Sequence, residues 1–305
     1  GDVYKRQVLN NTKVIPARLS GTRTRTISPK NIVTAKIAIN LIERIAKDTW
    51  VALVKPLRKL DLGEIIDIGL GLNAKITHKS NGTATLCFNK SGQELDESLY
   101  AIGSMPLPPY IEKKRSADSR DAVDYQTIWA KEPGSVAAPT ASLHFDKELL
   151  TKLKRLGVTI TFVTLHVGAG TFLPVKVDDI SEHQMHPEIG YISETAATEI
   201  NETKSSGNRV IPVGTTALRL IESAAQDDGF VNAWSGQTDI FIYPGFNFKV
   251  ADGLMTNFHL PKSTLLMLVS ALMGADRIKQ IYAHALQKKY RFCLLYTSPS
   301  PRDDE

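Results

Sequence analysis

The sequence predicts an α/β (mixed α and β) protein with a larger α/β domain, whose sheet is largely parallel, and a small antiparallel β-barrel domain. Three observations predict this class. Short alternating strands recur about every ten residues in the first part of the chain, and helix and strand alternate after residue 110. The apolar, β-branched run at residues 161–167 ends abruptly in Gly168-Ala169-Gly170, which is typical of a buried strand that leads into a site.

The barrel is predicted from strand-length runs between turn signals. Residues 32–40 alternate apolar and polar side chains, and Ser80-Asn81-Gly82 is a hairpin turn signal. Pro106-Leu107-Pro108-Pro109 ends this region, because proline cannot donate to a ladder and restricts the residue before it. The predicted strands after the first one span residues 50–54, 63–69, 74–76 and 83–88.

The α/β part is predicted from apolar periodicity and helix-stop signals. Phe145, Leu149, Leu150, Leu153 and Leu156 share one helical face, and Gly157 supplies the C-terminal cap. The further predicted strands are 158–167, 209–213 and 239–243, and the further helices are 193–204, from the Gly214-Thr215-Thr216 loop to about residue 225, and 263–273.

Composition is that of an ordinary globular protein. The 305 residues are 42% hydrophobic and 23% charged, which is enough for two domains and a sizeable core. No apolar run reaches the roughly 18 residues that span a bilayer, and the start lacks signal-peptide segments, so a cytoplasmic protein without membrane contact is expected. Cys87 and Cys293 are far apart and form no CxxC pair, so neither a disulfide framework nor a zinc-thiolate site is indicated.

Positive charge is concentrated in the first part of the chain. Residues 1–115 hold 19 Lys and Arg against 10 Asp and Glu, a balance of +9, and the remaining 18 and 22 give −4, which together make the net +5. Such a region favours a polyanion, because bound phosphates release counterions. A solvated basic surface is the alternative.

Three loops at predicted strand ends are candidate site loops: 168–171, 214–216 and 244–246. Gly214-Thr215-Thr216 precedes a helix, whose free amides suit a carboxylate or phosphate, although a plain helix cap explains it equally well. The Gly168-Ala169-Gly170 loop lacks the following helix that a nucleotide-binding loop needs, so these glycines are interpreted as allowing close approach of a flat ring.

Histidines recur at the ends of predicted elements. His144, His166 and His259 all occupy such boundaries, so at least one of them is a catalytic candidate. His183 and His186 lie three residues apart between glutamates and would form a metal pair on a helix, but Pro187 makes a regular helix there unfavourable. Residues 255–264 combine polar side chains with Phe258 before a helix and are a candidate lid over an aromatic ligand.

Several segments, in order, resemble the S-adenosylmethionine:tRNA ribosyltransferase-isomerase family of queuosine biosynthesis. The stretches are NNTKVIPARL at 10–19, GSVAAPTASLHF at 134–145, residues 165–188, VGTTALR at 213–219 and DGLMTNFHLPKST at 252–264. The resemblance runs from about residue 8 to 292. It implies a small β-barrel set within a larger α/β domain, which agrees with the change of pattern near residue 110.

The resemblance implies transfer of the ribosyl part of S-adenosylmethionine to 7-aminomethyl-7-deazaguanine at the tRNA wobble position, and its isomerisation to epoxyqueuosine, with release of adenine and methionine. No cofactor and no metal are expected, since S-adenosylmethionine is consumed as a substrate. The expected partner is a tRNA anticodon stem-loop, and the expected state is a monomer. A metal-dependent hydrolase using His183 and His186, or a non-catalytic RNA-binding protein, are the alternative functions.

We assign site residues as a hypothesis on the chemistry of this reaction and, for RNA, on the basic first part of the chain. The acid and base roles are expected among His144, His166, Glu182 and His259. Substrate binding is expected from Gly168, Gly170, Thr171, Phe172, Thr215, Thr216, Arg219 and Asn257. Contacts to RNA phosphates are expected from Lys13, Arg18, Arg23, Arg25, Lys55, Arg58 and Lys59.

The expected domain limits are residues 1–16 for the start of the large domain, 17–109 for the barrel and 110–292 for the rest of the large domain. The family begins several dozen residues before Asn10, and residues 293–305 replace its usual aromatic ending with a Ser/Pro-rich segment. The expectation is therefore an incomplete copy of the family protein with foreign ends.

Overall fold

The chain forms two compact units in the computed structural model: residues 1–13 with 124–305, and residues 14–123. The structure describes residues 5–28, 31–80, 82–108, 111, 115, 117–168, 180, 183 and 185–290. The sequence placed the barrel limits at residues 17 and 109, inside the second unit.

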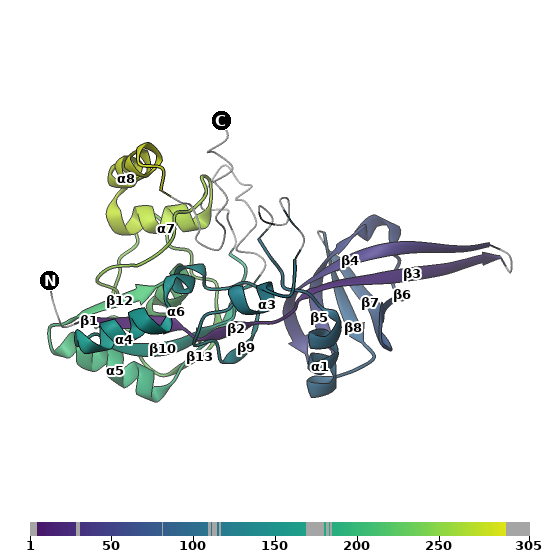
Figure 1. The fold of residues 1–305 in the computed structure, drawn as a ribbon, viewed down its shortest axis with the longest axis horizontal. Coiled ribbons are helices and arrows are strands. Elements are labelled where there is room, and N and C mark those ends of the chain that lie inside the picture. Colours follow the sequence, from purple (N-terminus) through teal and green to yellow (C-terminus); the bar gives the residue numbers. More distant parts are fainter. Residues whose placement is uncertain are drawn as a thin grey trace. The chain divides into compact units, whose positions relative to one another are not determined.

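The first unit is built on a mixed five-stranded sheet (Figure 1). Its strand order is β12-β1-β10-β11-β13. Strands β12, β1 and β10 run parallel, whereas β11 and β13 continue the sheet antiparallel. The strands span Lys5–Asn10 (β1), Thr159–Leu165 (β10), Glu188–Ile192 (β11), Arg209–Val213 (β12) and Trp234–Thr238 (β13).

Successive side chains of the parallel strands point to opposite faces of the sheet, and helices bury them on both faces. Val8, Val163 and Leu165 pack against α5 (Glu194–Ser205) and α6 (Thr215–Ser223) on one face. Leu9 and Val213 pack with Phe145, on the opposite face, beside η2 (Thr140–His144) and α4 (Lys147–Arg155). The parallel strands therefore end between two helical layers.

Two further helices cover the outer side of α6. Leu218 of α6 packs with Leu268 of α7 (Thr264–Met273) and Ile278 of α8 (Ala275–Gln287). A short pair, β2 (Thr12–Val14) with β9 (Glu132–Ser135), follows β1, and α3 spans Asp121–Asp124. Among the described helices, none combines the length and apolar character that crossing a membrane needs.

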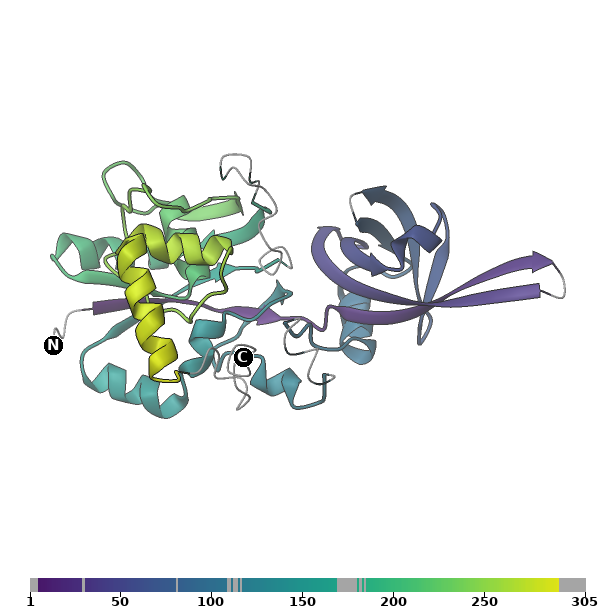
Figure 2. The same ribbon diagram turned by 90° about the horizontal axis from the view of Figure 1, so that it is seen from above.

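The second unit contains a closed antiparallel barrel in the order β3-β4-β5-β8-β7-β6. The barrel interior is apolar, with Ile37, Ile66 and Leu86 fully buried. Its strands span Arg18–Ser28 (β3), Asn31–Ala46 (β4), Thr49–Lys55 (β5), Ile65–Gly69 (β6), Leu72–Ser80 (β7) and Thr83–Phe88 (β8), accompanied by η1 (Leu57–Lys59) and α1 (Gly92–Ile102). Figure 2 shows β3 and β4 extending beyond the other strands.

The α/β class and the small antiparallel barrel are confirmed. The largely parallel sheet holds for the β12-β1-β10 half, and the other half is antiparallel. The predicted strand at 239–243 is wrong, because the ladder lies one segment earlier, at β13. Ile240 and Ile242 instead bury their side chains against the α6, α7 and α8 cluster, so their apolar character reflects packing rather than a strand.

Candidate active site

Asn10 joins the carboxyl ends of two parallel strands to the start of α6. Its side chain is fully buried at the end of β1. The amide Nδ2 donates to the Leu165 carbonyl at 2.9 Å and to Thr216 Oγ1 at 3.3 Å, and Oδ1 accepts from the backbone N–H of Leu165 and of Thr12 at 3.1 Å each. All four hydrogen bonds are buried, so Asn10 fixes the end of β10 and the start of α6 relative to β1.

Thr12 holds the ring of His166, the first residue after β10. Thr12 Oγ1 lies 2.8 Å from His166 Nδ1, and Thr12 is fully buried. Burial lowers the pKa of His166 below its usual value, and the nearby Glu132 carboxylate opposes that shift. His166 Nε2 has no hydrogen-bond partner among the residues that the structure describes.

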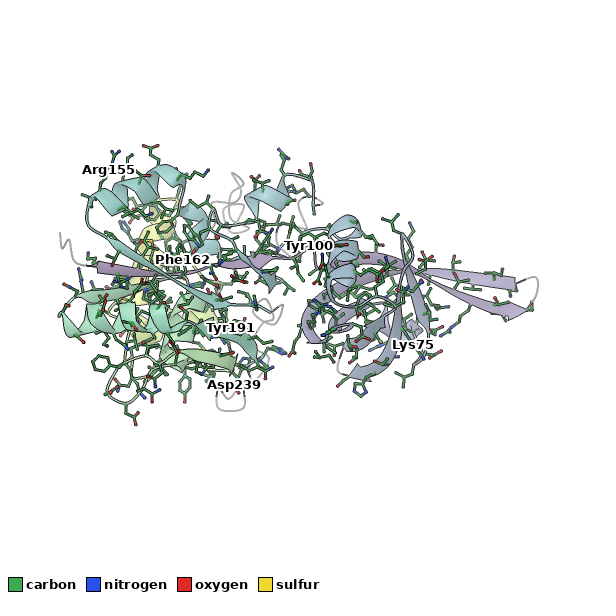
Figure 3. The ribbon with its side chains drawn as sticks, turned by 90° about the horizontal axis from the view of Figure 1, so that it is seen from below. Lys75, Tyr100, Arg155, Phe162, Tyr191 and Asp239 are labelled. Atoms are coloured by element: carbon green, nitrogen blue, oxygen red, sulfur yellow. The ribbon has the colours of Figure 1, made fainter. Side chains whose placement is uncertain are left out.

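The flat side of the His166 ring lies against backbone. Gly134 of β9 has φ +147°, and a Cβ added there would lie 3.0 Å from that ring, so any other residue would be strained and would press on the imidazole. Tyr191 of β11, labelled in Figure 3, packs edge-on against the ring with centroids 6.1 Å apart. The ring is therefore held at Nδ1 and by two neighbouring strands.

A buried ion pair supports the Gly168 backbone. Arg219 of α6 donates from Nη1 to Glu188 Oε2, and both side chains are almost fully buried. Glu188 Oε1 accepts from the Gly168 N–H at 3.1 Å, and Arg219 Nε donates to the Ile240 carbonyl at 3.4 Å. Arg219 was expected to bind an anion, but here its guanidinium already neutralises a protein carboxylate.

The N-terminus of α6 lies beside this cluster. Gly214 has φ +92°, a conformation that favours glycine, and no side chain caps the helix there. Asn10 contacts Thr216 from β1, and the Gly214 N–H donates to the Met255 carbonyl at 2.8 Å. The buried pair Thr215 and Thr216 opens a helix whose positive dipole end suits an anion.

His144 and Asn257 meet beside the α6 start. Thr140 Oγ1 donates to Asn257 Oδ1 at 2.9 Å, and this fixes the amide so that Asn257 Nδ2 faces His144 Nε2 at 2.9 Å. His144 Nε2 is then the acceptor, and the neutral ring carries its hydrogen on Nδ1. Withdrawal of part of the ring from water lowers the pKa of His144. His144 therefore presents a hydrogen-bond donor.

His259 is placed differently from the other two histidines. It is 9% exposed, and burial lowers its pKa to about 4. Its Nε2 lies 3.0 Å from Thr256 Oγ1, and the Tyr282 hydroxyl of α8 both accepts from its N–H and donates to its carbonyl. These contacts hold the 255–260 segment on α8, and burial keeps the imidazole neutral at pH 7.

Other expected site residues are not brought together as a metal set. His183 packs on the Phe241 ring with centroids 5.1 Å apart, and His186 is exposed. In the described part of the chain, no three His, Cys, Asp or Glu side chains gather in a way that could hold a metal ion. Four expected site residues lie outside the described residues: Gly170, Thr171, Phe172 and Glu182.

The expected RNA-contact residues differ in availability. Arg23 is 5% exposed and donates to the Lys59 carbonyl at 3.0 Å. Arg25 donates to Glu64 at 2.5 Å and also to Asp61. Their charges are thus satisfied within the barrel, whereas three other expected residues are exposed: Lys55, Arg58 and Lys59. Arg18 belongs to β3, and Lys13 lies in β2.

Reasoning from the sequence alone missed the residues that position the candidates. Asn10 and Thr12 lie in a polar triplet at the carboxyl end of a buried strand, and that position is the signal that would have identified them. Glu188 was considered only as a neighbour of the possible metal pair. The described cluster can hold a neutral imidazole with one free nitrogen, a second ring that donates, and an anion at a helix N-terminus.

Comparison with known proteins shows the family to which the chain belongs. The chain matches the family described as "Queuosine biosynthesis protein" over residues 4–295. It is 62% identical over 287 residues to the S-adenosylmethionine:tRNA ribosyltransferase-isomerase of Ruegeria pomeroyi, covering 94% of this chain and 82% of that protein. The same enzyme of Ruegeria sp. (strain TM1040) is 59% identical over the same shares.

A crystal structure of S-adenosylmethionine tRNA ribosyltransferase from Thermotoga maritima is 34% identical, with a TM-score of 0.45, over 94% of this chain and 79% of that one. The resemblance read from the sequence is confirmed by the family match and by the curated relatives. The chain belongs to the queuosine biosynthesis protein family.

Proposed function

We propose that this chain is an S-adenosylmethionine:tRNA ribosyltransferase-isomerase. It transfers the ribosyl part of S-adenosylmethionine to 7-aminomethyl-7-deazaguanine at the wobble position of tRNA and rearranges it to the epoxycyclopentane of epoxyqueuosine. Adenine and methionine leave. The observation that carries this proposal is 62% identity to a protein of that name across 94% of the chain. A cytoplasmic monomer acting on the anticodon stem-loop is part of the same proposal.

The reaction needs groups that accept and donate protons. The sulfonium acidifies the adjacent C5′ protons, so a positioned base can remove one, and adenine leaves more readily when it is protonated. The attacking amine must also lose a proton, while methionine departs as a neutral thioether. These steps need neither a redox cofactor nor a metal ion.

His166 is the proposed proton-transfer residue. Its partner Thr12 has a rotatable hydroxyl, which can donate to Nδ1 or accept from it. When the hydroxyl donates, the hydrogen of the neutral ring is on Nε2, and when it turns toward the Glu132 carbonyl 3.5 Å away, Nε2 becomes the acceptor. A carboxylate partner would fix one tautomer, whereas this hydroxyl permits both a base and an acid at Nε2.

His144 is the proposed donor to the substrate. Asn257 occupies its Nε2, so Nδ1–H is the atom that faces an acceptor such as an adenine nitrogen or a carboxylate oxygen. Asn257 then acts by orienting the ring as well as by binding substrate. His259, which is buried and neutral, is proposed to hold the 255–260 segment in place rather than to transfer protons.

The start of α6 is the proposed anion site. Thr215 and Thr216 present the uncapped helix end to the methionine carboxylate or to an RNA phosphate. Arg219 contributes indirectly, because its pair with Glu188 supports the Gly168 N–H. Glu182 is proposed as a further acid or base, and the pocket for the flat rings is proposed to involve Gly168, Gly170, Thr171 and Phe172.

RNA phosphates are proposed to bind the exposed basic residues of the barrel unit, Lys55, Arg58 and Lys59, together with Arg18 and Lys13. Arg23 and Arg25 are already engaged by carbonyl and carboxylate oxygens of the barrel, so they are weaker contact residues.

The test is transfer of label from S-adenosylmethionine labelled in its ribose. Precursor tRNA that carries 7-aminomethyl-7-deazaguanine should gain the label, and the same tRNA with guanine at that position should not. A non-catalytic RNA-binding protein would bind the precursor without labelling it. A metal-dependent hydrolase would copurify with metal and lose activity on chelation, and either result would contradict the proposal.

A further inference from the structure

The barrel carries a two-stranded ribbon that continues past its ladder partners. β3 pairs with β6 only at Thr22 and Arg23, and β4 pairs with β5 from Ala38 onwards. Residues 24–28 and 31–34, here called the ribbon, are therefore paired with each other and with no other described strand, and residues 35–37 pair with residues 21–23 at its base. Both Figure 1 and Figure 2 show this pair reaching beyond the other barrel strands.

The two faces of the ribbon have different chemistry. Paired residues of a ladder share a face, and successive residues alternate. Thr24 pairs with Thr34 and Thr26 with Ile32, next to the pair of Thr22 with Lys36. All six side chains are exposed. We call this face, which holds Thr22, Thr24, Thr26, Thr34 and Lys36 together with the apolar Ile32, the hydroxyl face.

The face opposite the hydroxyl face contacts the barrel through its arginines. Arg23 and Arg25 point to this opposite face, and their guanidinium groups bind the Lys59 carbonyl, Glu64 and Asp61. These two arginines therefore stabilise the base of the ribbon. Lys36, by contrast, has no ion-pair partner among the described residues, so its charge is left on the hydroxyl face.

Acidic residues are excluded from these two strands over a long stretch. Residues 18–42 contain five Lys and Arg and no Asp or Glu, and the first acidic residue is Glu43. Asp67 of β6 is aligned with Thr22 and marks the barrel end of the hydroxyl face. Lys36 is aligned with Thr22 as well, so Lys36, Thr22 and Asp67 form one row at the base of the ribbon. Beyond this row the face offers threonine hydroxyls and Ile32 without an acidic residue, which suits the hydroxyl-lined surface of a polyanion better than an acidic protein.

The ribbon exposes large apolar side chains and unpaired strand edges. Ile27 is 67% exposed and Ile32 62%, and bare β edges with such side chains promote association unless something covers them.

The wide, shallow minor groove of an RNA stem displays 2′-hydroxyls between phosphates. Threonine hydroxyls both donate and accept, as the 2′-hydroxyl does, and Lys36 suits a phosphate.

We propose that the hydroxyl face of the ribbon binds the minor groove of the double-stranded stem of the substrate RNA, with threonine hydroxyls on 2′-hydroxyls and Lys36 on a phosphate. This inference rests on the proposed function for the identity of the RNA. It assigns stem binding to a surface separate from the residues that contact the reacting groups.

The test compares the parent chain with Thr24→Val/Thr26→Val, which removes two hydroxyls at nearly constant shape. Binding is measured with an anticodon stem-loop whose stem is ribose or deoxyribose. The parent should prefer the ribose stem, and the variant should bind that stem about fivefold or more weakly and lose most of the preference. Thr77→Val, an exposed threonine on β7 of the same barrel, is the matched control and should bind like the parent.

Lys36→Ala should reduce the slope of log affinity against log salt by roughly 0.7 to 0.9, the amount expected for one phosphate contact. Equal affinities for parent and double valine variant, an unchanged ribose preference, or an equal loss in Thr77→Val would overturn the proposal. So would a concentration-dependent dimer that the double variant abolishes while RNA affinity stays unchanged.

The ribose-transfer assay separates the two proposals. Label transfer with no effect of the ribbon variants on binding defeats the ribbon proposal alone. Ribbon-dependent stem binding without label transfer defeats the catalytic proposal alone.

Discussion

Replacement of His259 by glutamine tests whether this histidine supports the fold or transfers protons. Glutamine keeps a polar group near Thr256 Oγ1 but cannot titrate. Burial lowers the pKa of His259 from 6.5 to about 4. The unfolded chain therefore binds a proton near pH 6.5 that the folded chain refuses until about pH 4, so stability from this group is complete above pH 6.5 and is lost as the pH falls through that window.

The difference of 2.5 pKa units corresponds to about 3 kcal/mol at 1.36 kcal/mol per unit. Urea unfolding at pH 7.5 and pH 4.5 should therefore show a loss of stability that is about 2 to 3 kcal/mol smaller in His259→Gln than in the parent. His78→Gln, an exposed histidine of the barrel, should retain the parent's pH dependence.

Adenine release by His259→Gln at pH 7 should stay within a few fold of the parent, provided that the variant is folded. An identical pH dependence of stability in parent and variant would refute the argument from burial. A hundredfold loss of adenine release at unchanged stability would instead place His259 in the chemistry.

Three further predictions concern the hydrogen-bonded pairs of the site. Thr12→Val should lower the rate of adenine release about tenfold, because His166 Nδ1 loses its 2.8 Å partner, whereas Thr12→Ser should retain most of the rate; equal rates in both variants would contradict this role. Asn257→Asp should raise the pKa of His144 by placing a carboxylate beside Nε2, so the limb of the pH–rate profile that reports His144 should move to higher pH. An unmoved profile would argue against that contact. Glu188→Gln should destabilise the fold by about 3 kcal/mol or more, because Arg219 loses its buried counter-charge, and Glu188→Gln/Arg219→Gln should recover part of that loss in urea unfolding; additive losses would show that the two side chains are not coupled.

The barrel could be predicted from the sequence because its information is local. Strand alternation and the turn signal at Ser80-Asn81-Gly82 correspond to a ladder that joins β7 to β8. Helix α4 could be predicted for the same reason, since its apolar face and Gly157 lie within one short segment. Such patterns need no knowledge of the rest of the chain.

The strand prediction at 239–243 failed for a reason that is not local. Trp234 to Thr238 has no apolar side chain apart from its tryptophan, yet it forms β13 because β11 offers an open edge to it. The more apolar Ile240 and Ile242 are needed by the α6, α7 and α8 cluster instead. The spacing of apolar residues in a sequence indicates which side chains are buried. In this segment the side chains are buried although the backbone forms no strand ladder.

The sequence supplied candidate site residues but not the hydrogen bonds that hold them. His144, His166 and the Gly214 loop were identified because each ends an element. Their partners were not, because Thr12 and His166 are 154 residues apart, and Asn10 and Thr216 are 206 apart. A single sequence carries no signal for hydrogen bonds over such separations, so Arg219 also looked available when Glu188 already binds it.

Adenine release from S-adenosylmethionine by parent and His166→Ala, in the presence of precursor tRNA, tests the account most directly. The parent should release adenine only when the tRNA carries 7-aminomethyl-7-deazaguanine. His166→Ala should be slower by about a hundredfold or more with its fold retained, the usual size of a general acid–base contribution. Release at the parent's rate by His166→Ala, or no release by the parent on that tRNA, would contradict it.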